Sequence, residues 1–257
     1  MLAIYKKEMR SYFINPVGYV FVGVFLTLAA GICCYTTLQQ SSYSTSSYFY
    51  YLLLSMIIIV PLLTMRTFAE ERKMRTEQMM LTSPVTIIQM VLGKFFAAFT
   101  MFGGCLLISL INLLPLYIVG AEEKALTDYS ITHIGPVTAE IAGSVIGILL
   151  VGGAFIAIGV FISSLTENQL SAAIVTIAAL LVMVILNIIN SIGDESEGTR
   201  LINNYVVRYV IDWFSVFSRY TTFQYGILDW SALLYYVSLT FIFIYLTVRV
   251  YERRRWA

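Results

Sequence analysis

Charged side chains gather in one stretch of the sequence, Met65 to Lys94, which separates two long apolar runs. The stretch is acidic as well as basic: Glu70 and Glu71 precede Arg72, and Glu71 and Arg75 are spaced to pair across one helical turn. One interpretation is a charged loop that only fixes topology, because Lys and Arg resist translocation across a membrane. That role needs no acidic residues, so we favour a surface that a cytoplasmic partner pushes against.

Local spacing predicts that this stretch forms two short helices joined by a tight corner. Thr67 and Glu70 fit a capping box that opens the first helix, Thr67–Leu81. Ser83 as N-cap and Pro84 at the first helical position open the second, which continues into the next apolar run.

Motifs for bond-making chemistry are missing from the sequence. Gly93-Lys94 is followed by Phe95 and lacks the upstream glycine of a phosphate-binding loop. The single histidine, His133, excludes HExxH, and the three cysteines fall inside apolar runs, where we expect them to pack as small apolar residues. We therefore expect no catalytic, cofactor-binding or metal-binding residues on this chain, and the net charge of +1 gives no reason to expect nucleic acid as a partner.

Composition identifies lipid as the surrounding solvent. The chain has 257 residues, is 59% hydrophobic and is only 12% charged, well below the roughly 25% typical of soluble domains. A helix needs about 20 apolar residues to cross the hydrocarbon core. Six such runs predict an all-α integral membrane protein, a single domain over residues 1–257. The predicted spans are 17–38, 48–65, 95–119, 141–165, 170–192 and 230–248.

None of these predicted spans contains Asp, Glu, Lys, Arg or His. Ion-coupled carriers and channels usually place ionisable residues within the bilayer. The absence therefore argues against a stand-alone channel or proton-coupled pump, and the energy for any transport must come from a partner.

The distribution of positive charge predicts the orientation. With six spans, both termini lie on one side, which collects twelve Lys and Arg residues: Lys6, Lys7, Arg10, Arg66, Arg72, Lys73, Arg75, Lys94, Arg249, Arg253, Arg254 and Arg255. The other side holds four: Lys124, Arg200, Arg208 and Arg219. Both termini are therefore expected in the cytoplasm.

The first 15 residues read as a helix that lies in the membrane surface. Its apolar face comprises Leu2, Tyr5, Met9, Tyr12 and Phe13. Its polar face carries the interfacial anchor residues Lys6, Lys7 and Arg10. A basic anchor that only satisfies the orientation rule is an alternative, and both can hold. Asn15 and Pro16 predict the cap and first turn of span one.

Two features of the outer side are readable. Residues 193–229 contain an amphipathic segment of short helices before span six, which Asp229 caps. Within span four, Gly143 and Gly147 form a GxxxG pattern, which lets helix backbones approach closely. The sequence leaves open whether that approach is within one chain or between subunits.

Three blocks carry a resemblance to a known family. They are Ala69-Glu-Glu-Arg-Lys-x-x-Thr76-Glu, Leu81-Thr-Ser-Pro84-Val and Val91-Leu-Gly-Lys94-Phe. Together they resemble the permeases of ABC-2-type transporters, especially the gliding-motility permease-like branch. The N-terminal Lys-Lys-Glu-Met-Arg-Ser-Tyr-Phe block and the closing Arg-Arg-Arg-Trp256 are similar to the same branch.

The resemblance implies a type V exporter fold: two six-span subunits side by side, each with a coupling helix between spans two and three. In such an arrangement the region 66–94 meets a nucleotide-binding subunit. The residues implied at this interface are Glu70, Glu71, Arg72, Lys73, Arg75, Thr76, Glu77, Ser83 and Pro84.

We therefore expect a non-catalytic permease subunit in a bacterial cell membrane, exporting a substrate with energy from a separate ATPase present in two copies. ATP and Mg²⁺ would bind the ATPase, not this chain. The resemblance leaves open a homodimer or heterodimer and an outer accessory protein. The alternative is an ATP-driven mechanotransmitting anchor that moves an outer partner without translocating a substrate.

Overall fold

The computed structural model describes residues 1–38, 45–75, 86–126, 136–191 and 215–256. These residues form helices, and no strand occurs among them. The helices are α1 (Leu2–Ile14), α2 (Pro16–Cys33), the π-helical turn η1 (Cys34–Leu38), α3 (Ser46–Thr64), α4 (Ala69–Lys73), α6 (Ile87–Ser109), the 3₁₀ turn η2 (Leu110–Leu113), α7 (Leu114–Leu126), α8 (Thr138–Leu165), α9 (Gln169–Ser191), η3 (Ser218–Tyr220), α11 (Thr221–Gln224) and α12 (Trp230–Trp256).

Six helical segments among the described residues are long and apolar enough to cross a membrane, which confirms the predicted fold class. They are Pro16–Thr37, Ser46–Lys73, Ile87–Gly120, Thr138–Leu165, Gln169–Ile189 and Trp230–Arg255. The second and third differ most from their predictions. The second continues past residue 65 to Lys73, and the third differs at its start. The third begins at Ile87, where the first helical turn is already apolar. It therefore includes Lys94, which was predicted to precede the span.

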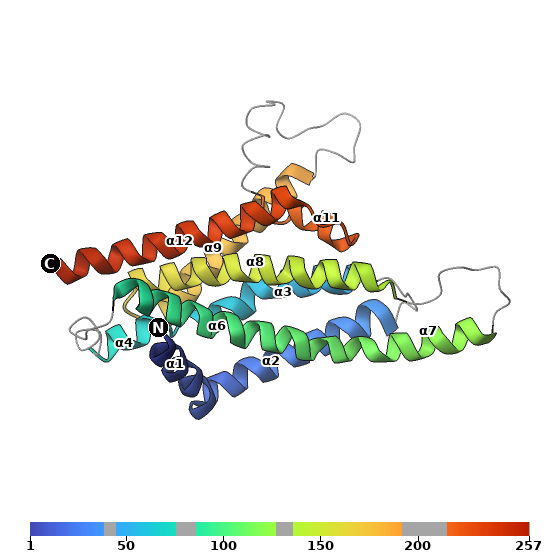
Figure 1. The fold of residues 1–257 in the computed structure, drawn as a ribbon, viewed down its shortest axis with the longest axis horizontal. Helices are drawn as coiled ribbons and strands as arrows, with labels where there is room; N and C mark the ends of the chain where they lie inside the picture. The colour runs from blue at the N-terminus through green and yellow to red at the C-terminus, as the bar shows by residue number, and fades with distance from the viewer. Residues whose placement is uncertain (39–44, 76–85, 127–135, 192–214, 257) are drawn as a thin grey trace.

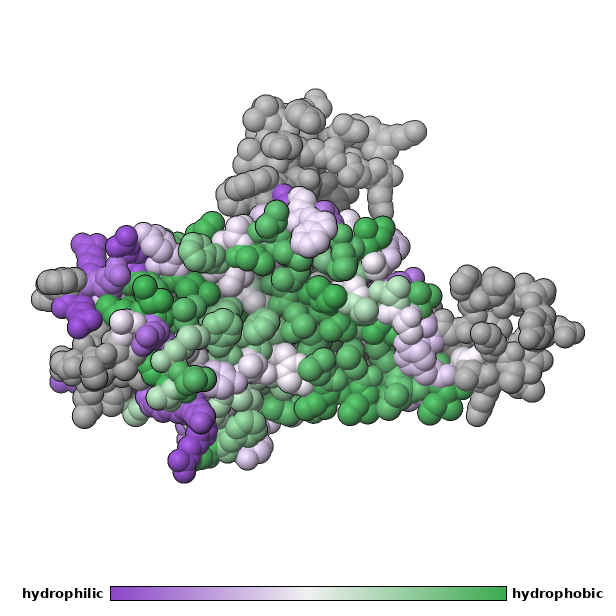
Figure 2. All heavy atoms as spheres, viewed as in Figure 1, coloured by the Kyte–Doolittle hydropathy of each residue, from purple (hydrophilic) through white to green (hydrophobic). Residues whose placement is uncertain are grey.

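The spans lie roughly side by side along the long axis of the molecule, with α8 in the middle (Figure 1). Helix α8 packs against α3, α6, α9 and α12, and 72% of an apolar stretch of 18 residues within it is buried, against 17% for the corresponding stretch of α9. Both termini lie at the end that holds α4 (Figure 1). Figure 2 shows hydrophilic residues gathered at this end and a hydrophobic band over the middle of the helices. That this end faces the cytoplasm stays a prediction.

Helix α1 forms where predicted, and Asn15 and Pro16 occupy the predicted cap and first-turn positions of α2. Part of its apolar face, however, packs on its own chain. The Tyr5 hydroxyl donates to Thr100 Oγ1 on α6 at 3.2 Å, and the Tyr12 hydroxyl reaches the Leu63 carbonyl on α3 at 3.5 Å. Leu2 and Phe13 stay exposed. Only the ends of α1 therefore offer large apolar side chains to lipid.

The glycines of α8 pack within the chain, which answers the question left open by the GxxxG pattern. A Cβ atom on Gly143 would lie 2.6 Å from the Phe223 carbonyl oxygen and 2.7 Å from the Gly226 Cα. A Cβ on Gly147 would lie 2.9 Å from the Tyr220 ring. The small face of α8 thus receives the short helices η3 and α11, which lie in the segment predicted to face the outer side.

The predicted outer segment 193–229 is described from residue 215 onward, and its residues up to 214 lie outside the described part of the chain. The described portion contains η3 and α11, in agreement with short helices before span six. The backbone N–H of Ser231 donates to Asp229 Oδ1 at 2.9 Å, which confirms the predicted cap of α12.

Candidate functional site

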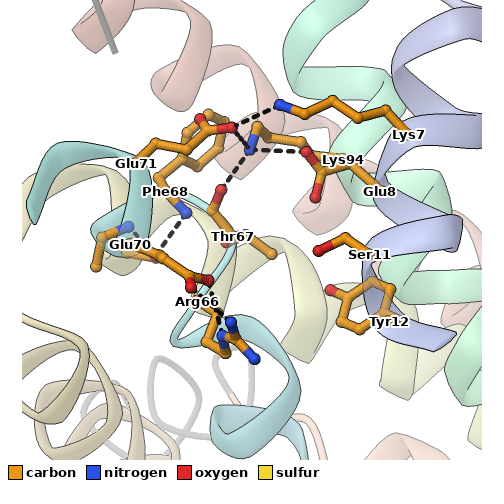
Figure 3. A network of polar contacts seen from close by, with 12 residues as sticks. Lys7, Glu8, Ser11, Tyr12, Arg66, Thr67, Phe68, Glu70, Glu71 and Lys94 are labelled. Carbon is orange, nitrogen blue, oxygen red and sulfur yellow. Dashed lines mark hydrogen bonds and ion pairs between the residues drawn. The ribbon is translucent and has the colours of Figure 1, made fainter. Parts of the chain in front are cut away.

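Lys94 is the centre of a buried ionic cluster at the end of the molecule that holds α4. Its side chain is 1% exposed, and its ammonium lies 2.9 Å from Glu71 Oε1 and 3.2 Å from Glu8 Oε1. The same ammonium donates to the Thr67 carbonyl at 2.5 Å and lies 4.8 Å from the Phe68 ring centroid. Figure 3 shows these groups converging on Lys94. An ammonium has three donors, so its capacity is filled by oxygens from α1, the α3–α4 corner and α4.

Arg66 and Glu70 form a second ion pair beside the first. Arg66 Nε lies 2.7 Å from Glu70 Oε2 and its Nη2 lies 2.5 Å from Glu70 Oε1, a bidentate geometry that is among the strongest for charged groups. We call Glu8, Arg66, Glu70, Glu71 and Lys94 the α4 cluster.

A small polar cavity of about 30 Å³ separates α1 from Arg66 and Glu70. Glu8, Ser11 and Tyr12 form its α1 side. Burial, reinforced by the nearby Glu8 carboxylate, raises the pKa of the Tyr12 phenol, so this group stays a neutral hydrogen-bond donor at physiological pH. The cavity is polar and large enough for a water molecule to bridge α1 to the corner.

The predicted capping box is wrong. The Thr67 hydroxyl donates to the Thr64 carbonyl at 2.8 Å and so closes the end of α3, while Glu70 is held by Arg66 one turn earlier. Phe68 occupies the N-cap position of α4 without a side-chain cap. An opposite charge four residues away competes successfully with a backbone N–H for the Glu70 carboxylate.

Helix α4 is also shorter than the predicted helix Thr67–Leu81. It ends at Lys73, and Arg75 adopts a positive φ of 56°, the left-handed conformation that terminates helices. Arg75 therefore cannot pair with Glu71 across a helical turn as predicted, and Glu71 contacts Lys94 and Lys7 instead.

The helix leading into the third span begins at Ile87, with Thr86 as its N-cap, so the prediction that Ser83 caps this helix is wrong. Thr86 Oγ1 accepts the Gln89 N–H at 3.4 Å. The hydroxyl nearest to the first helical turn takes the capping role. Four of the residues implied at the partner interface lie outside the described residues: Thr76, Glu77, Ser83 and Pro84.

The remaining implied interface residues divide into two groups. Glu70 and Glu71 point into the α4 cluster, and Arg72 donates to the Leu165 carbonyl at the end of α8. Lys73 and Arg75 are exposed, and between them Met74 is 60% exposed. The first group holds α4 in place, whereas the second is exposed at its end.

The α1 residues predicted as an interfacial anchor are exposed: Lys6, Lys7 and Arg10. Lys7 has a further role, because its ammonium lies 3.4 Å from Glu71 Oε1. With a side chain that is 58% exposed, this pair is screened by solvent and contributes little to stability.

Sequence reasoning missed Glu8, Lys94 and Ser163 as members of this site. Lys94 was assigned to the cytoplasmic charges and to a family block, but no partner was assigned to its ammonium. It lies among the apolar residues Val91, Leu92 and Phe95, where a lone lysine requires a buried acidic partner. The acidic Glu8 among the basic residues of α1 was the matching signal. Ser163, described below, carried no such signal.

The site is built to hold helices together. Its acidic and basic groups pair with one another across α1, the α3–α4 corner, α4 and α6. No group of three or more metal-ligating side chains occurs among the residues that the structure describes. These contacts hold α4 to the helices around it, because separating a buried pair by moving one partner costs several kcal/mol, roughly 3–5.

A comparison with protein families gives one match. The model described as ABC-2 family transporter protein matches residues 35–251, which include α3 to α9 and most of α12. None of the curated proteins matches the chain.

Proposed function

The chain belongs to the ABC-2 family of transporter proteins, whose members are membrane permease subunits that partner an ABC ATPase. We propose that this chain couples ATP hydrolysis on that separate subunit to substrate export. The observation that carries this proposal is the α4 cluster. It fixes the short helix α4 to α1, the α3–α4 corner and α6 through buried and partly buried ion pairs. A helix held in this way moves the spans when a partner moves it.

The surface offered to the ATPase is Lys73, Met74 and Arg75, together with the residues implied by the family blocks beyond them. It combines two cations with one large apolar side chain. We propose that it meets an acidic-rimmed apolar groove on the ATPase, because complementary charge steers association and a buried apolar anchor supplies affinity.

The rest of the assembly is part of the same proposal. Two ATPase copies bind ATP and Mg²⁺ and meet two permease subunits, as a homodimer or heterodimer, in a bacterial cell membrane with both termini cytoplasmic. Membership of the gliding-motility branch and the presence of an outer accessory protein stay predictions. Lys6, Lys7 and Arg10 at the surface of α1 support contact with anionic lipid headgroups.

A double charge reversal at and just after the end of α4 tests the docking surface. Replacing Lys73 and Arg75 by glutamate should weaken binding of the ATPase about tenfold or more and lower ATP hydrolysis by the reconstituted complex, because two attractive contacts become repulsive. Both side chains are exposed, so the unfolding midpoint should not change. Microscale thermophoresis measures the affinity for the ATPase, and a hydrolysis assay in proteoliposomes measures the ATPase activity of the complex.

The control is Tyr225→Glu, at another exposed position, far from α4 along the molecule, and this variant should bind the ATPase normally. Unchanged binding in the α4 double variant would contradict the docking surface. Charge reversal at Glu70 or Glu71 is a poorer test, because these side chains hold the α4 cluster itself. Vesicles that hydrolyse ATP yet move no lipid, peptide or small molecule would contradict export and favour the mechanotransmitting anchor.

A further inference from the structure

The hydroxyl of Ser163, near the end of α8, is fully engaged with the α3–α4 corner. Ser163 Oγ accepts the backbone N–H groups of Phe68 and Ala69, both at 3.2 Å, and donates to the Met65 carbonyl at 3.3 Å. A hydroxyl has one donor and two acceptor sites, so all of its capacity serves this one contact. The side chain is completely buried.

Helix α4 depends on this contact for its N-terminal cap. It has only five residues, too few for a helix to be stable alone, and its N-cap residue Phe68 offers no side-chain oxygen. Ser163 therefore supplies from another helix the oxygen that a cap residue normally supplies from its own. At the other end of α4, Arg72 donates to the Leu165 carbonyl at 3.1 Å. Both ends of α4 are thus attached to the last turn of α8.

The close approach of α3 to α8 supports the same attachment. A Cβ atom on Gly159 would lie 2.2 Å from Thr64 Oγ1, so the last turn of α3 lies directly against α8, one turn before Ser163. From there α8 runs through the middle of the molecule to Gly143 and Gly147, which receive the outer helices η3 and α11 (Figure 1). One straight helix therefore connects α4 with the outer face.

We infer that Ser163 is a positioning residue that couples α4 to α8, so that displacement of α4 by the ATPase moves α8 and, through it, the outer helices. The inference rests on the proposed function and adds the path by which displacement passes from α4 to the outer helices. The α4 cluster joins α4 to α1 and α6, and Ser163 joins α4 to the central helix. The Arg72 contact lies nearer to solvent, with a side chain that is 23% exposed, and is the weaker of the two attachments to α8.

The neighbouring serine provides a matched control. Ser164 is as deeply buried as Ser163, but its hydroxyl donates to Phe161 of the same helix at 2.6 Å and so joins no second element. Ser163→Ala and Ser164→Ala therefore remove the same atom from adjacent positions on α8. Ser163→Thr keeps the hydroxyl and tests for rescue.

The experiment is hydrogen exchange followed by mass spectrometry on the permease–ATPase complex in lipid nanodiscs, with and without a non-hydrolysable ATP analogue. In the native chain and in Ser164→Ala, the analogue should change exchange in both α4 and the last turns of α8. In Ser163→Ala, the change in α4 should persist while the change in α8 falls about fivefold, the factor expected for one hydrogen bond. Ser163→Thr should restore the α8 response.

Three other outcomes would contradict the inference. An α8 response in Ser163→Ala equal to that in Ser164→Ala would overturn the coupling role. Loss of ATPase binding in Ser163→Ala would also overturn it, since Ser163 would then only shape the docking surface. A native complex in which the analogue changes nothing in α4 would instead refute the proposed function, and the inference with it.

Discussion

Replacing Lys94 by methionine should lower the free energy of unfolding by roughly 3–5 kcal/mol, the cost of removing one partner from a buried ion pair. Methionine preserves most of the side-chain length, so the loss isolates the charge. Glu8 and Glu71, each with only 14% of its side chain exposed, would lose their shared cation, and the Thr67 carbonyl would lose its donor. Denaturant unfolding in a fixed detergent, with tryptophan fluorescence as the signal, measures the change.

Lys7→Ala is the matched control for this prediction. Lys7 contacts the same Glu71 oxygen, but its side chain is 58% exposed, so its removal should cost less than about 1 kcal/mol. A Lys94→Met protein as stable as the Lys7→Ala protein would show that the α4 cluster contributes little to holding α1, α4 and α6 together.

The second large effect is expected at Gly143. A methyl group there would overlap the Phe223 carbonyl oxygen and the Gly226 Cα, which are backbone atoms that no side-chain rotation can move aside. Gly143→Ala should therefore separate α11 from α8 and cost about 1–3 kcal/mol. Limited proteolysis of the outer segment, together with the unfolding midpoint, reports both consequences.

Gly104 on α6 supplies the comparison. A Cβ atom there meets nothing within 4 Å, and alanine is the better helix former, so Gly104→Ala should be neutral or slightly stabilising. Equal stability of the two alanine variants would mean that the α8–α11 contact is looser than the backbone distances indicate. A dimerisation defect in Gly143→Ala with unchanged monomer stability would instead place this glycine at a subunit interface.

The six spans were predictable because lipid imposes one dominant requirement, about 20 apolar residues per helix. The predicted boundaries of the fourth and fifth spans lie within three residues of the structure. The third span was misplaced for a specific reason. Lys94 was taken as the edge of the hydrocarbon, whereas Glu8 and Glu71 neutralise it and allow the helix to begin about two turns earlier, at Ile87.

The site was only partly predictable because its contacts are long-range. Local rules placed a helix after span two, and α4 is there. The same rules paired Glu70 with Thr67 and Glu71 with Arg75, because they consider only neighbours along the chain. In the structure, Glu71 pairs with a lysine on α6 and Ser163 caps α4 from α8. Partners this distant in sequence cannot be assigned from spacing along one chain.

The division of the implied interface residues has the same origin. The residues implied at the interface include both Glu70 and Glu71 and the more exposed Lys73 and Arg75. Which of them face a partner depends on the rotation of α4 about its axis, and that rotation is set by Lys94 and Ser163 together. A sequence pattern can identify a functional segment. It does not distinguish the residues that attach the segment to its own chain from those that contact a partner.

The most direct test of the account is photo-cross-linking of the permease to its ATPase. A photoreactive phenylalanine analogue at position 74, where Met74 is 60% exposed on the α4 surface, should form a covalent adduct with the ATPase subunit. The same analogue in place of Tyr225, 71% exposed at the other end of the molecule, should form none. An ATPase adduct from position 225 and not from position 74 would contradict α4 as the point where the energy of ATP hydrolysis enters this chain.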